Sequence, residues 1–532
     1  MRLNLALASL LALSLAACDQ PNSPSSEAAA EAATKDPNTL VLVAGSEVKD
    51  MAPLLEQMKA ETGVTLTFKY VGTLDGIEGI ATGQQYDGAW FSHAKYLMLM
   101  PDAAKKVKAS EKIMLSPVVI GVKESKVKAF GWNSTTSWAE MARQADKGAF
   151  HFAMTNPTSS NSGFSALVGV AASFAGKSDA LEESDIDKAG MASLFKGVTL
   201  TSGSSGWLAD RYVEEQASLD GIVNYESVLL SMNRAGTLKE KLHLIYPQDG
   251  VLTADYPLIL LNEAKRAAYD KAVAWLKGEK AQTWLMRNTM RRPINPAVPL
   301  DKSLFGDTLL VDMAFPGKLS VVNALLLSYL GEQRLPSSTY FVLDVSGSMQ
   351  GERIEGLRGA LKSLASREGN SLTSMFASFQ PRERITLIPF SDQVRTADIL
   401  QLEVDKASPA ASLGQVFSYA GALQAEGGTA MYDGLMEAYR RVAEDMARDP
   451  NRYYTVVVMT DGETRDGAIF ADFKQWFNAQ PPAIRKIKTF PVLFGEGSES
   501  ELKDVATMTG GKYFDSRTTS LSLMFKDIRG YQ

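Results

Sequence analysis

A run of small oxygen-bearing side chains follows an apolar segment in the second half of the chain. The stretch FVLDVSGSMQ, residues 341–350, places Asp344, Ser346 and Ser348 at alternate positions after a predicted buried strand. Because side chains alternate along extended backbone, these three converge on one side of a loop at the C-terminal edge of a sheet. Carboxylate and hydroxyl oxygens suit a hard divalent cation, so the spacing predicts a metal site that favours Mg²⁺, with Mn²⁺ or Ca²⁺ as alternatives.

Two later segments supply further oxygens in the order that such a site needs. EGGTAMYDGL places Thr429 on a glycine-containing turn before a predicted helix, and YYTVVVMTDGETRDG places Asp461 at the end of another apolar strand. The complete set resembles the metal-ion-dependent adhesion site (MIDAS) of von Willebrand factor A (VWA) domains, which is the pattern D-x-S-x-S followed by a Thr and an Asp. The predicted metal ligands are Asp344, Ser346, Ser348, Thr429 and Asp461.

The resemblance extends over residues 337–532, where apolar strands and helical segments alternate. It implies a Rossmann-like, doubly wound α/β domain. It also implies that the hydroxyls contact the cation, that the two Asp side chains bind it directly or through water, and that an acidic residue of a partner protein completes the coordination. The alternative is a vestigial site whose oxygens only cap loops.

The preceding part of the chain also alternates between strands and helices. TLVLVAG, a helical segment with Met51, Leu54, Leu55 and Met58 on one face, and VTLTFKYVG together predict a βαβ unit. The pattern over residues 39–300 resembles the type 2 periplasmic solute-binding proteins, which implies two α/β lobes joined by crossover strands with ligand in the cleft. Residues 301–336 are predicted to connect this region to the VWA domain.

Hydroxyl and amide side chains at the ends of predicted strands are the candidates for lining that cleft. The resemblance implies these positions: Ser46, Thr73, Ser92, Thr155, Asn156, Ser160 and Ser162. The run around Ser162 opens an apolar helix whose free N–H groups and dipole favour an oxyanion or carboxylate. The alternative is that these residues are N-caps that satisfy their own chain. Tyr225, Glu226 and Asp249 are further candidates, and the two acidic residues would suit a cationic or hydroxylated ligand, so the ligand class stays open.

The N-terminus has the features of an exported lipoprotein. Residues 1–17 contain Arg2, a short apolar run and small residues, which indicate a signal peptide. The ending LAAC resembles a bacterial lipobox, which implies diacylglycerol on Cys18, the only cysteine. Residues 18–38 are rich in Pro, Ser, Ala and Glu and are predicted to be a flexible tether. Asp19 resembles an inner-membrane retention signal, so we expect a lipid-anchored protein of the cell envelope that faces the periplasm if the cell is Gram-negative.

Composition argues against several functional classes. The net charge of −6, from 55 Lys and Arg against 61 Asp and Glu, gives no basic excess for nucleic acid. The only histidines are His93, His151 and His243, and their spacing fits neither a zinc site nor a catalytic motif. No phosphate-binding loop or nucleophile elbow is present. We therefore expect a binding protein and not an enzyme.

Two functions of different kinds remain. The first is a membrane-anchored extracytoplasmic binding protein whose VWA domain grips a partner protein through the divalent metal, with the solute-binding-like region as a sensor or scaffold. The alternative is a solute receptor of the ABC-transporter type with the VWA domain as a docking accessory. A third interpretation is an assembly factor that works with an ATPase, against which the signal peptide argues if that ATPase is cytoplasmic.

Overall fold

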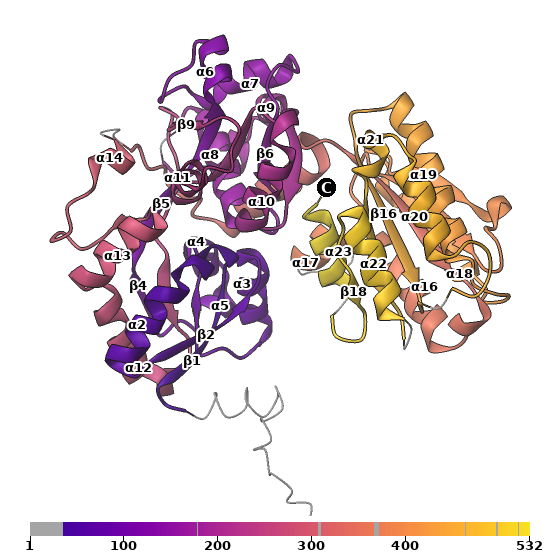
Figure 1. Cartoon of the computed structure of the whole chain (residues 1–532), viewed down its shortest axis with the longest axis horizontal. Helices are drawn as coiled ribbons and strands as arrows, with labels where there is room; N and C mark the ends of the chain where they lie inside the picture. The colour runs from indigo at the N-terminus through magenta and orange to yellow at the C-terminus, as the bar shows by residue number, and fades with distance from the viewer. Residues whose placement is uncertain are drawn as a thin grey trace, which may run out of the picture.

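The computed structural model describes residues 36–177, 179–306, 310–366, 372–462, 464–495, 498–519 and 521–531. The predicted signal peptide, Cys18 and residues 18–35 of the predicted tether lie outside the described residues. Figure 1 shows the first half of the chain, coloured indigo to magenta, beside a second body coloured orange to yellow. Both are built from α/β units, as predicted, and their sheets are covered by helices.

The first lobe is built on a five-stranded sheet of order β2-β1-β3-β11-β4. β1 pairs in parallel with β2 and β3, whereas β11 runs antiparallel to both of its neighbours. The strands are β1 (Thr39–Ala44), β2 (Thr65–Tyr70), β3 (Gly88–Trp90), β4 (Ala109–Lys112) and β11 (Pro257–Leu260). The helices are η1 (Ser46–Met51), α2 (Ala52–Thr62), α3 (Thr73–Thr82), α4 (Lys95–Leu99), α5 (Pro101–Ala104), η4 (Glu263–Lys265), α12 (Arg266–Leu276) and α13 (Glu279–Thr289).

The second lobe has a sheet of order β10-β5-β8-β6-β7, to which β9 and β12 add by pairing with β5. The strands are β5 (Met114–Lys123), β6 (Phe152–Thr155), β7 (Val198–Ser202), β8 (Gly221–Tyr225), β9 (Leu242–Ile245), β10 (Thr253–Ala254) and β12 (Arg292–Pro293). The helices are α6 (Glu124–Phe130), α7 (Trp138–Asp146), α8 (Asn161–Ala175), η2 (Glu183–Asp185), α9 (Lys188–Phe195), α10 (Ser205–Glu215), η3 (Gln216–Ser218) and α11 (Glu226–Ala235). The chain crosses between the lobes from β4 to β5 and again from β10 to β11.

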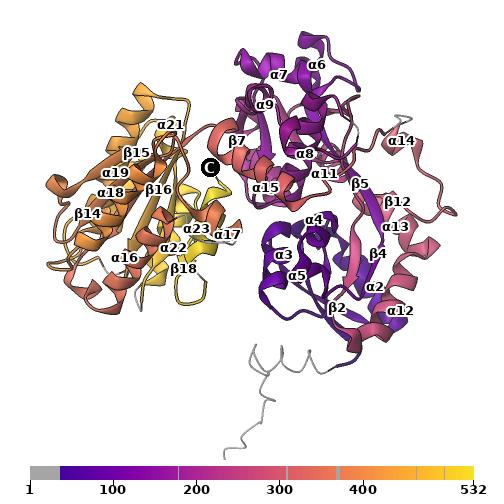
Figure 2. The same cartoon turned by 180° about the vertical axis from the view of Figure 1, so that it is seen from behind.

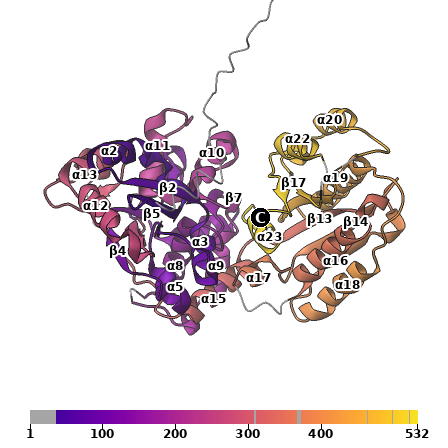
Figure 3. The same ribbon diagram turned by 90° about the horizontal axis from the view of Figure 1, so that it is seen from below.

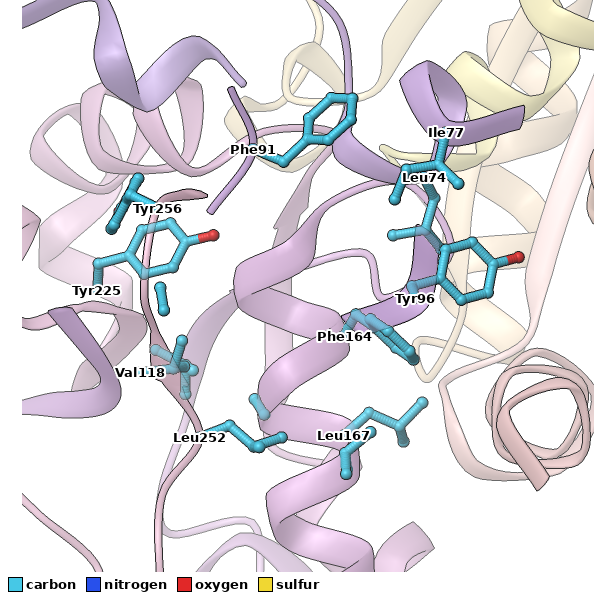
Figure 4. Close-up of a cluster of buried hydrophobic side chains, with 14 of the residues drawn as sticks. Leu74, Ile77, Phe91, Tyr96, Val118, Phe164, Leu167, Tyr225, Leu252 and Tyr256 are labelled. Atoms are coloured by element: carbon cyan, nitrogen blue, oxygen red, sulfur yellow. The ribbon is translucent and has the colours of Figure 1, made fainter. Parts of the chain in front are cut away.

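The crossing places apolar side chains from both lobes in one buried cluster. Figure 4 shows Leu74 and Phe91 of the first lobe in the same cluster as Phe164 and Tyr225 of the second. Burial of large apolar side chains is the main favourable term in folding, so this cluster stabilises the arrangement of the lobes as well as each lobe.

The connecting segment contains α14 (Lys302–Phe305), α15 (Leu319–Ser328) and a single π-helical turn, η5 (Tyr329–Gln333). The apolar segment LSVVNALLLSYL forms α15 and the start of η5 and is partly buried, as predicted for a core helix. Among the described residues, no helix combines the length and the apolar character needed to cross a bilayer.

The second body has a six-stranded sheet of order β15-β14-β13-β16-β17-β18, parallel except for β15. Its strands are β13 (Ser337–Asp344), β14 (Arg384–Phe390), β15 (Leu400–Glu403), β16 (Tyr453–Thr460), β17 (Lys488–Leu493) and β18 (Phe514–Asp515). Its helices are η6 (Gly347–Met349), α16 (Glu352–Ala365), α17 (Leu372–Ala377), η7 (Thr396–Asp398), α18 (Pro409–Ala422), α19 (Met431–Arg448), α20 (Phe470–Asn478), α21 (Pro482–Arg485), α22 (Glu499–Thr509) and α23 (Leu521–Arg529).

Both faces of this sheet are buried, which explains the continuous apolar strands in the sequence. Along β13, Phe341 and Leu343 pack into the core beneath α16 and α23, whereas Tyr340 and Val342 pack into the core beneath α19 and α20. Figure 3 shows helices on both sides of the sheet. The arrangement is the doubly wound α/β fold that was predicted, and it directs the loops after β13 and β16 to the same edge.

Candidate metal site and interlobe cleft

The predicted metal-site residues lie on three loops at one edge of the second sheet. β13 ends at Asp344 and β16 ends at Thr460, and the two strands are parallel neighbours. Side chains just beyond the two strand ends therefore come together. The loop before α19 joins them, because the Gly347 N–H donates to the Gly427 carbonyl at 2.9 Å. The fold brings together the loops that carry Asp344, Ser346, Ser348, Thr429 and Asp461.

Asp344 is fully buried at the base of this edge. Its Oδ1 accepts the Ser346 N–H at 2.9 Å and its Oδ2 accepts the Thr460 hydroxyl at 2.5 Å. Burial raises the pKa of Asp344 to about 6, although these donors favour the charged form. A metal ion beside the carboxylate would stabilise its charged form.

Asp461 provides the second carboxylate and is 3% exposed. Its Oδ1 is buried without a hydrogen-bond partner, whereas its Oδ2 accepts from the Arg353 guanidinium at 2.8 Å. The hydroxyl oxygens of Ser346 and Ser348 lie 3.0 Å apart. A buried acceptor without a donor is costly, and a cation would satisfy it. Arg353 is partly exposed and places a positive charge at the rim.

Thr429 is held in place by a residue that the sequence did not mark as important. The Thr429 N–H donates to Asp466 Oδ2 at 2.9 Å. A Cβ on Gly428 would lie 1.9 Å from the same oxygen, so a larger residue there would displace the Asp466 carboxylate from its bond to Thr429. Asp466 therefore positions the Thr429 turn. Nothing in the spacing of its loop could have revealed this, since the contact joins two separate segments.

The donor set fits a hard divalent cation. It offers two carboxylates and three hydroxyls, which are the oxygen ligands that Mg²⁺ uses in proteins. Across the described parts of the chain, no three His, Cys, Asp or Glu side chains gather into a group that could hold a metal. A site at this edge therefore depends on its hydroxyls as well as on its two carboxylates.

The seven predicted cleft residues belong to both lobes, and the lobes are closed on one another. Ser46 Oγ of the first lobe lies 2.9 Å from Ser204 Oγ of the second. A Cβ on Gly72 would lie 2.4 Å from the carbonyl oxygen of Ser159. Thr73 begins α3 and is buried, as is Ser92 after β3. The residues at the ends of the first-lobe strands therefore face the second lobe at short range.

The second-lobe candidates bond largely to their own chain. Thr155 Oγ1 accepts the Gly163 N–H at 2.7 Å and lies 2.8 Å from Ser162 Oγ. Asn156 Oδ1 accepts the Thr158 N–H at 3.0 Å, and Ser160 Oγ lies 3.5 Å from Ser162 Oγ. The Gly163 N–H at the start of α8 is thus already occupied. This pattern favours the capping interpretation for these hydroxyls, and ligand binding by the seven residues stays a prediction.

Buried polar atoms without hydrogen-bond partners gather where the lobes meet. They include Ser92 Oγ, Asn161 Oδ1, Tyr256 OH and Arg291 Nε, and each of these residues is at most 2% exposed. The Asn161 amide donates to Tyr225 OH at 3.2 Å, and the rings of Tyr225 and Tyr256 lie 5.9 Å apart between centroids. Burial raises the pKa of Tyr225 well above its ordinary value, so this phenol stays neutral.

Glu47 adds a carboxylate to this group. Its Oε1 is buried without a partner, and burial raises the pKa of Glu47 while Arg291 opposes the rise. Arg291 donates to the Glu47 carbonyl and to Asp50 Oδ2, both at 2.7 Å. We name the following set the polar junction: Glu47, Ser92, Asn161, Tyr225, Tyr256 and Arg291. Sequence reasoning identified Ser92 and considered Tyr225, but it missed the others because they come from segments far apart in the chain.

Glu226 and Asp249, the two acidic residues considered for the cleft, form hydrogen bonds and ion pairs within their own part of the fold. Glu226 is fully buried, accepts the Tyr246 hydroxyl at 2.6 Å and binds the Arg292 guanidinium through both oxygens at 2.8 Å. Asp249 Oδ2 accepts the Trp138 N–H at 3.2 Å, at the start of α7. These contacts satisfy both carboxylates within the fold.

Two family models match separate parts of the chain. Residues 39–291 match the family described as bacterial extracellular solute-binding protein, and residues 339–527 match the von Willebrand factor type A domain. The chain therefore combines a region that matches solute-binding proteins with a region that matches VWA domains.

Individual relatives cover only parts of this combination. Inter-alpha-trypsin inhibitor heavy chain H3 of Mesocricetus auratus is 28% identical over 234 residues, which are 42% of this chain and 24% of that protein. The human heavy chain H3 is 27% identical over 176 residues, 31% of this chain and 18% of that protein. This chain thus spans a quarter or less of the length of these relatives.

Solved structures align with about half of the chain. The sulfate-binding protein SubI of Mycobacterium tuberculosis is 20% identical, covers 54% of this chain and 96% of its own, and has a TM-score of 0.39. The periplasmic binding protein AfuA of Actinobacillus pleuropneumoniae, solved with fructose-6-phosphate, is 16% identical, covers 56% and 98%, and has a TM-score of 0.42.

Proposed function

We propose that this protein is a membrane-anchored extracytoplasmic binding protein whose VWA domain grips an acidic residue of a partner protein through a divalent cation. The observation that supports it best is the buried, unpartnered Oδ1 of Asp461 beside the buried carboxyl of Asp344. The residues that would hold the ion are Asp344, Ser346, Ser348, Thr429 and Asp461. The bound ion would act as a Lewis acid for an external carboxylate, with Mg²⁺ as the first candidate and Mn²⁺ or Ca²⁺ as alternatives.

Two residues beside the ion site would position one of its ligands and attract an acidic partner. Asp466 holds the Thr429 turn, so the threonine hydroxyl is positioned before any ion binds. Arg353, 38% exposed, adds a positive charge at the rim that would attract an acidic surface. Both parts of the chain match types of domain that are usually binding modules, and we propose no catalytic activity.

We also propose that diacylglycerol on Cys18 attaches the protein to the inner membrane with the folded regions in the periplasm. The proposal rests on the sequence of residues 1–19. A single acyl modification site with a polar tether would hold the domains near the membrane without crossing it. Mass spectrometry of the N-terminal peptide from the native membrane tests this, and an unmodified Cys18 there would contradict it.

Affinity capture from the native membrane tests metal-dependent gripping. We expect a partner that is retained in Mg²⁺, released by a chelator and lost with Asp344→Asn. Asp102→Asn is the matched control, because Asp102 is an exposed aspartate of the first lobe whose contact is a surface ion pair with Lys105. If the same amount of partner protein is retained with the chelator and with Asp344→Asn, the result would contradict the proposal.

A second candidate function is binding of a small solute between the lobes, because the polar junction contains buried polar atoms without hydrogen-bond partners. Among its unpartnered atoms, Glu47 Oε1 and Asn161 Oδ1 are acceptors, Arg291 Nε is a donor, and the hydroxyls of Ser92 and Tyr256 can do either, so acceptors outnumber donors. We propose that the cleft takes a small solute that carries hydroxyl or protonated amine groups, in preference to an oxyanion. The occupied Gly163 N–H removes one donor that an oxyanion would need.

Thermal shift measurements with matched solutes test this second function. We expect stabilisation by polyols or small amines, and we expect Glu47→Gln to weaken the response to amines more than the response to polyols. A shift produced by sulfate or phosphate alone would contradict the assignment of the ligand class.

A further inference from the structure

The last helix of the VWA domain, α23, lies against both lobes of the solute-binding region. Figure 1 shows it between the VWA sheet and helices α3 and α10, and Figure 2 shows it beside α3 from behind. Its own side chains Met524, Phe525 and Ile528 belong to the VWA core. One rigid element of the second body therefore contacts two parts of the first body.

The contact with the first lobe is a buried ion pair. Lys526 Nζ lies 2.5 Å from Asp75 Oδ1 and 3.5 Å from Glu78 Oε2, and both acidic residues are on α3. The Lys526 side chain is 1% exposed. A buried ammonium needs opposite charge near it, and removing its partners leaves an uncompensated charge. Burial alone would lower the pKa of Lys526, but Asp75 and Glu78 hold it above its ordinary value.

The contact with the second lobe is made by backbone carbonyls at the end of α23. Asn156 Nδ2 donates to the Arg529 carbonyl at 2.7 Å, and Thr201 Oγ1 donates to the Gly530 carbonyl at 3.2 Å. The last carbonyls of a helix have no partner within the helix. The second lobe supplies those partners, and Asn156, which is also a predicted cleft residue, caps the end of α23.

The VWA domain holds α23 firmly at the same end. The Arg529 guanidinium binds Glu383, with Nη2 at 2.9 Å from Oε2, and its Nε donates to the Ala377 carbonyl at 3.0 Å. Glu383 Oε1 also accepts from Arg334 at 2.6 Å, and all three charged side chains are less than 8% exposed. The end of α23 therefore cannot follow one lobe away from the VWA domain without breaking this network.

We propose that α23 clamps the two lobes together, so that docking of the VWA domain and closure of the solute cleft are one coupled equilibrium. If the lobes rotate apart, Asp75 on one lobe and Asn156 on the other cannot both stay in contact with α23. A solute that binds the closed cleft must then favour the docked VWA domain, and by linkage the docked domain must strengthen solute binding. The linkage to solute rests on the solute-receptor function proposed above, whereas the clamp itself does not.

Distance measurements between spin labels on the two lobes test the clamp without any solute. One label replaces Glu56 on α2 and the other replaces Arg143 on α7, both exposed, in the full chain with Cys18→Ser so that no other cysteine is present. The perturbing variant is Lys526→Met, which keeps the unbranched apolar part of the side chain and removes its charge. The matched control is Lys503→Met on α22, whose ion pair with Glu499 lies within the VWA domain.

With Lys526→Met we expect the population of long interlobe distances to rise about tenfold or more, within the range typical of coupled sites. Lys503→Met should leave the distance distribution unchanged. Thr201→Val, which removes one donor from the second lobe, should shift the distribution in the same direction as Lys526→Met. A distribution identical to that of the unaltered chain in both Lys526→Met and Thr201→Val would overturn the clamp.

Charge exchange keeps the test interpretable if Lys526→Met fails to fold. Lys526→Glu combined with Asp75→Lys should restore the closed distribution that Lys526→Glu alone loses, and failure to restore it in a folded protein would also overturn the clamp. Because the labels report lobe closure directly, this result is independent of whether the cleft binds a solute. A solute titration of the same labelled chain then tests the linkage separately.

Discussion

Glu383 of the VWA domain lies between Arg334 of the connecting segment and Arg529 of α23, and neutralising it should destabilise the VWA domain strongly. Its side chain is 3% exposed, and it binds Arg334, 2% exposed, and Arg529, 7% exposed. Removing one member of a buried ion pair typically costs about 3–5 kcal/mol, because the remaining charge is left without compensation. Glu383→Gln leaves two such charges, so we expect a loss of at least about 4 kcal/mol in the unfolding free energy of the VWA domain.

Urea unfolding monitored by hydrogen exchange of β13 and β16 measures this loss for the VWA domain alone. With a denaturant slope of about 2 kcal/mol/M, the midpoint should fall by about 2 M. Glu403→Gln is the matched control, since Glu403 is 45% exposed in its pairs with Arg384 and Arg452 and should cost about 0–1 kcal/mol. Equal midpoints for the two variants would refute the assignment of Glu383 as a buried electrostatic anchor.

The pH dependence of the same effect has a defined sign. Burial alone would raise the pKa of Glu383, but Arg529 and Arg334 hold it below the ordinary value of 4.5. A carboxyl whose pKa is lower in the folded state contributes stability above pH 4.5, which is lost as the pH falls through the folded-state pKa. The difference between the unaltered protein and Glu383→Gln should therefore be constant at neutral pH and shrink only in acid.

Three further predictions follow from local geometry. Gly163→Ala would place a Cβ 2.1 Å from a backbone carbonyl oxygen and should destabilise the solute-binding region by about 1–3 kcal/mol in urea unfolding. Gly359→Ala on α16, where a Cβ would meet no atom within 4 Å, should stabilise the VWA domain by about 0.5–1 kcal/mol. Equal effects of the two substitutions on stability would contradict the packing described for these positions. Burial lowers the pKa of Lys488 to about 7 from 10.5, so the unfolded state binds the proton more tightly and the stability of the folded protein rises with pH between these values. The gain in melting temperature from Lys488→Met should therefore be largest at pH 7 and below and should shrink toward pH 10. A gain in melting temperature that is independent of pH would contradict this prediction. Gly428→Ala should collide with Asp466 and lower Mg²⁺ affinity about tenfold or more in calorimetric titration, and unchanged affinity would show that the loop contact is not needed for the site.

The meeting of the predicted metal-site residues at one edge of the sheet could be anticipated because each is marked locally. Asp344 ends one continuous apolar strand and Asp461 follows another, and parallel strands of a doubly wound sheet direct their following loops to a common edge. The alternation of strands and helices indicated the α/β class, whereas the two-lobed arrangement and the VWA fold were anticipated from the resemblances to known families. Asp466 could not be anticipated, since its role depends on a contact between two loops that no periodicity encodes.

The residues that would line a solute cleft are harder to identify from the sequence for the same physical reason. Hydroxyls after strands, such as Thr155, look alike in sequence whether they bind a ligand or cap their own helix, and in the structure Thr155 accepts the Gly163 N–H. Glu47 and Arg291 meet only after the chain has crossed between the lobes twice. Lys526 likewise reads as an ordinary basic residue of an amphipathic helix, and only tertiary structure buries it against α3.

Direct titration of the folded protein with Mn²⁺, followed by electron paramagnetic resonance, tests the central claim of a metal site at the edge of the VWA sheet. The account predicts that one Mn²⁺ binds per chain, that Mg²⁺ displaces it, and that Asp461→Asn weakens binding at least about tenfold while the domain stays folded. Absence of binding in the unaltered protein, or equal binding by Asp461→Asn, would contradict the claim and leave Asp344, Ser346, Ser348, Thr429 and Asp461 as residues that only order their own loops.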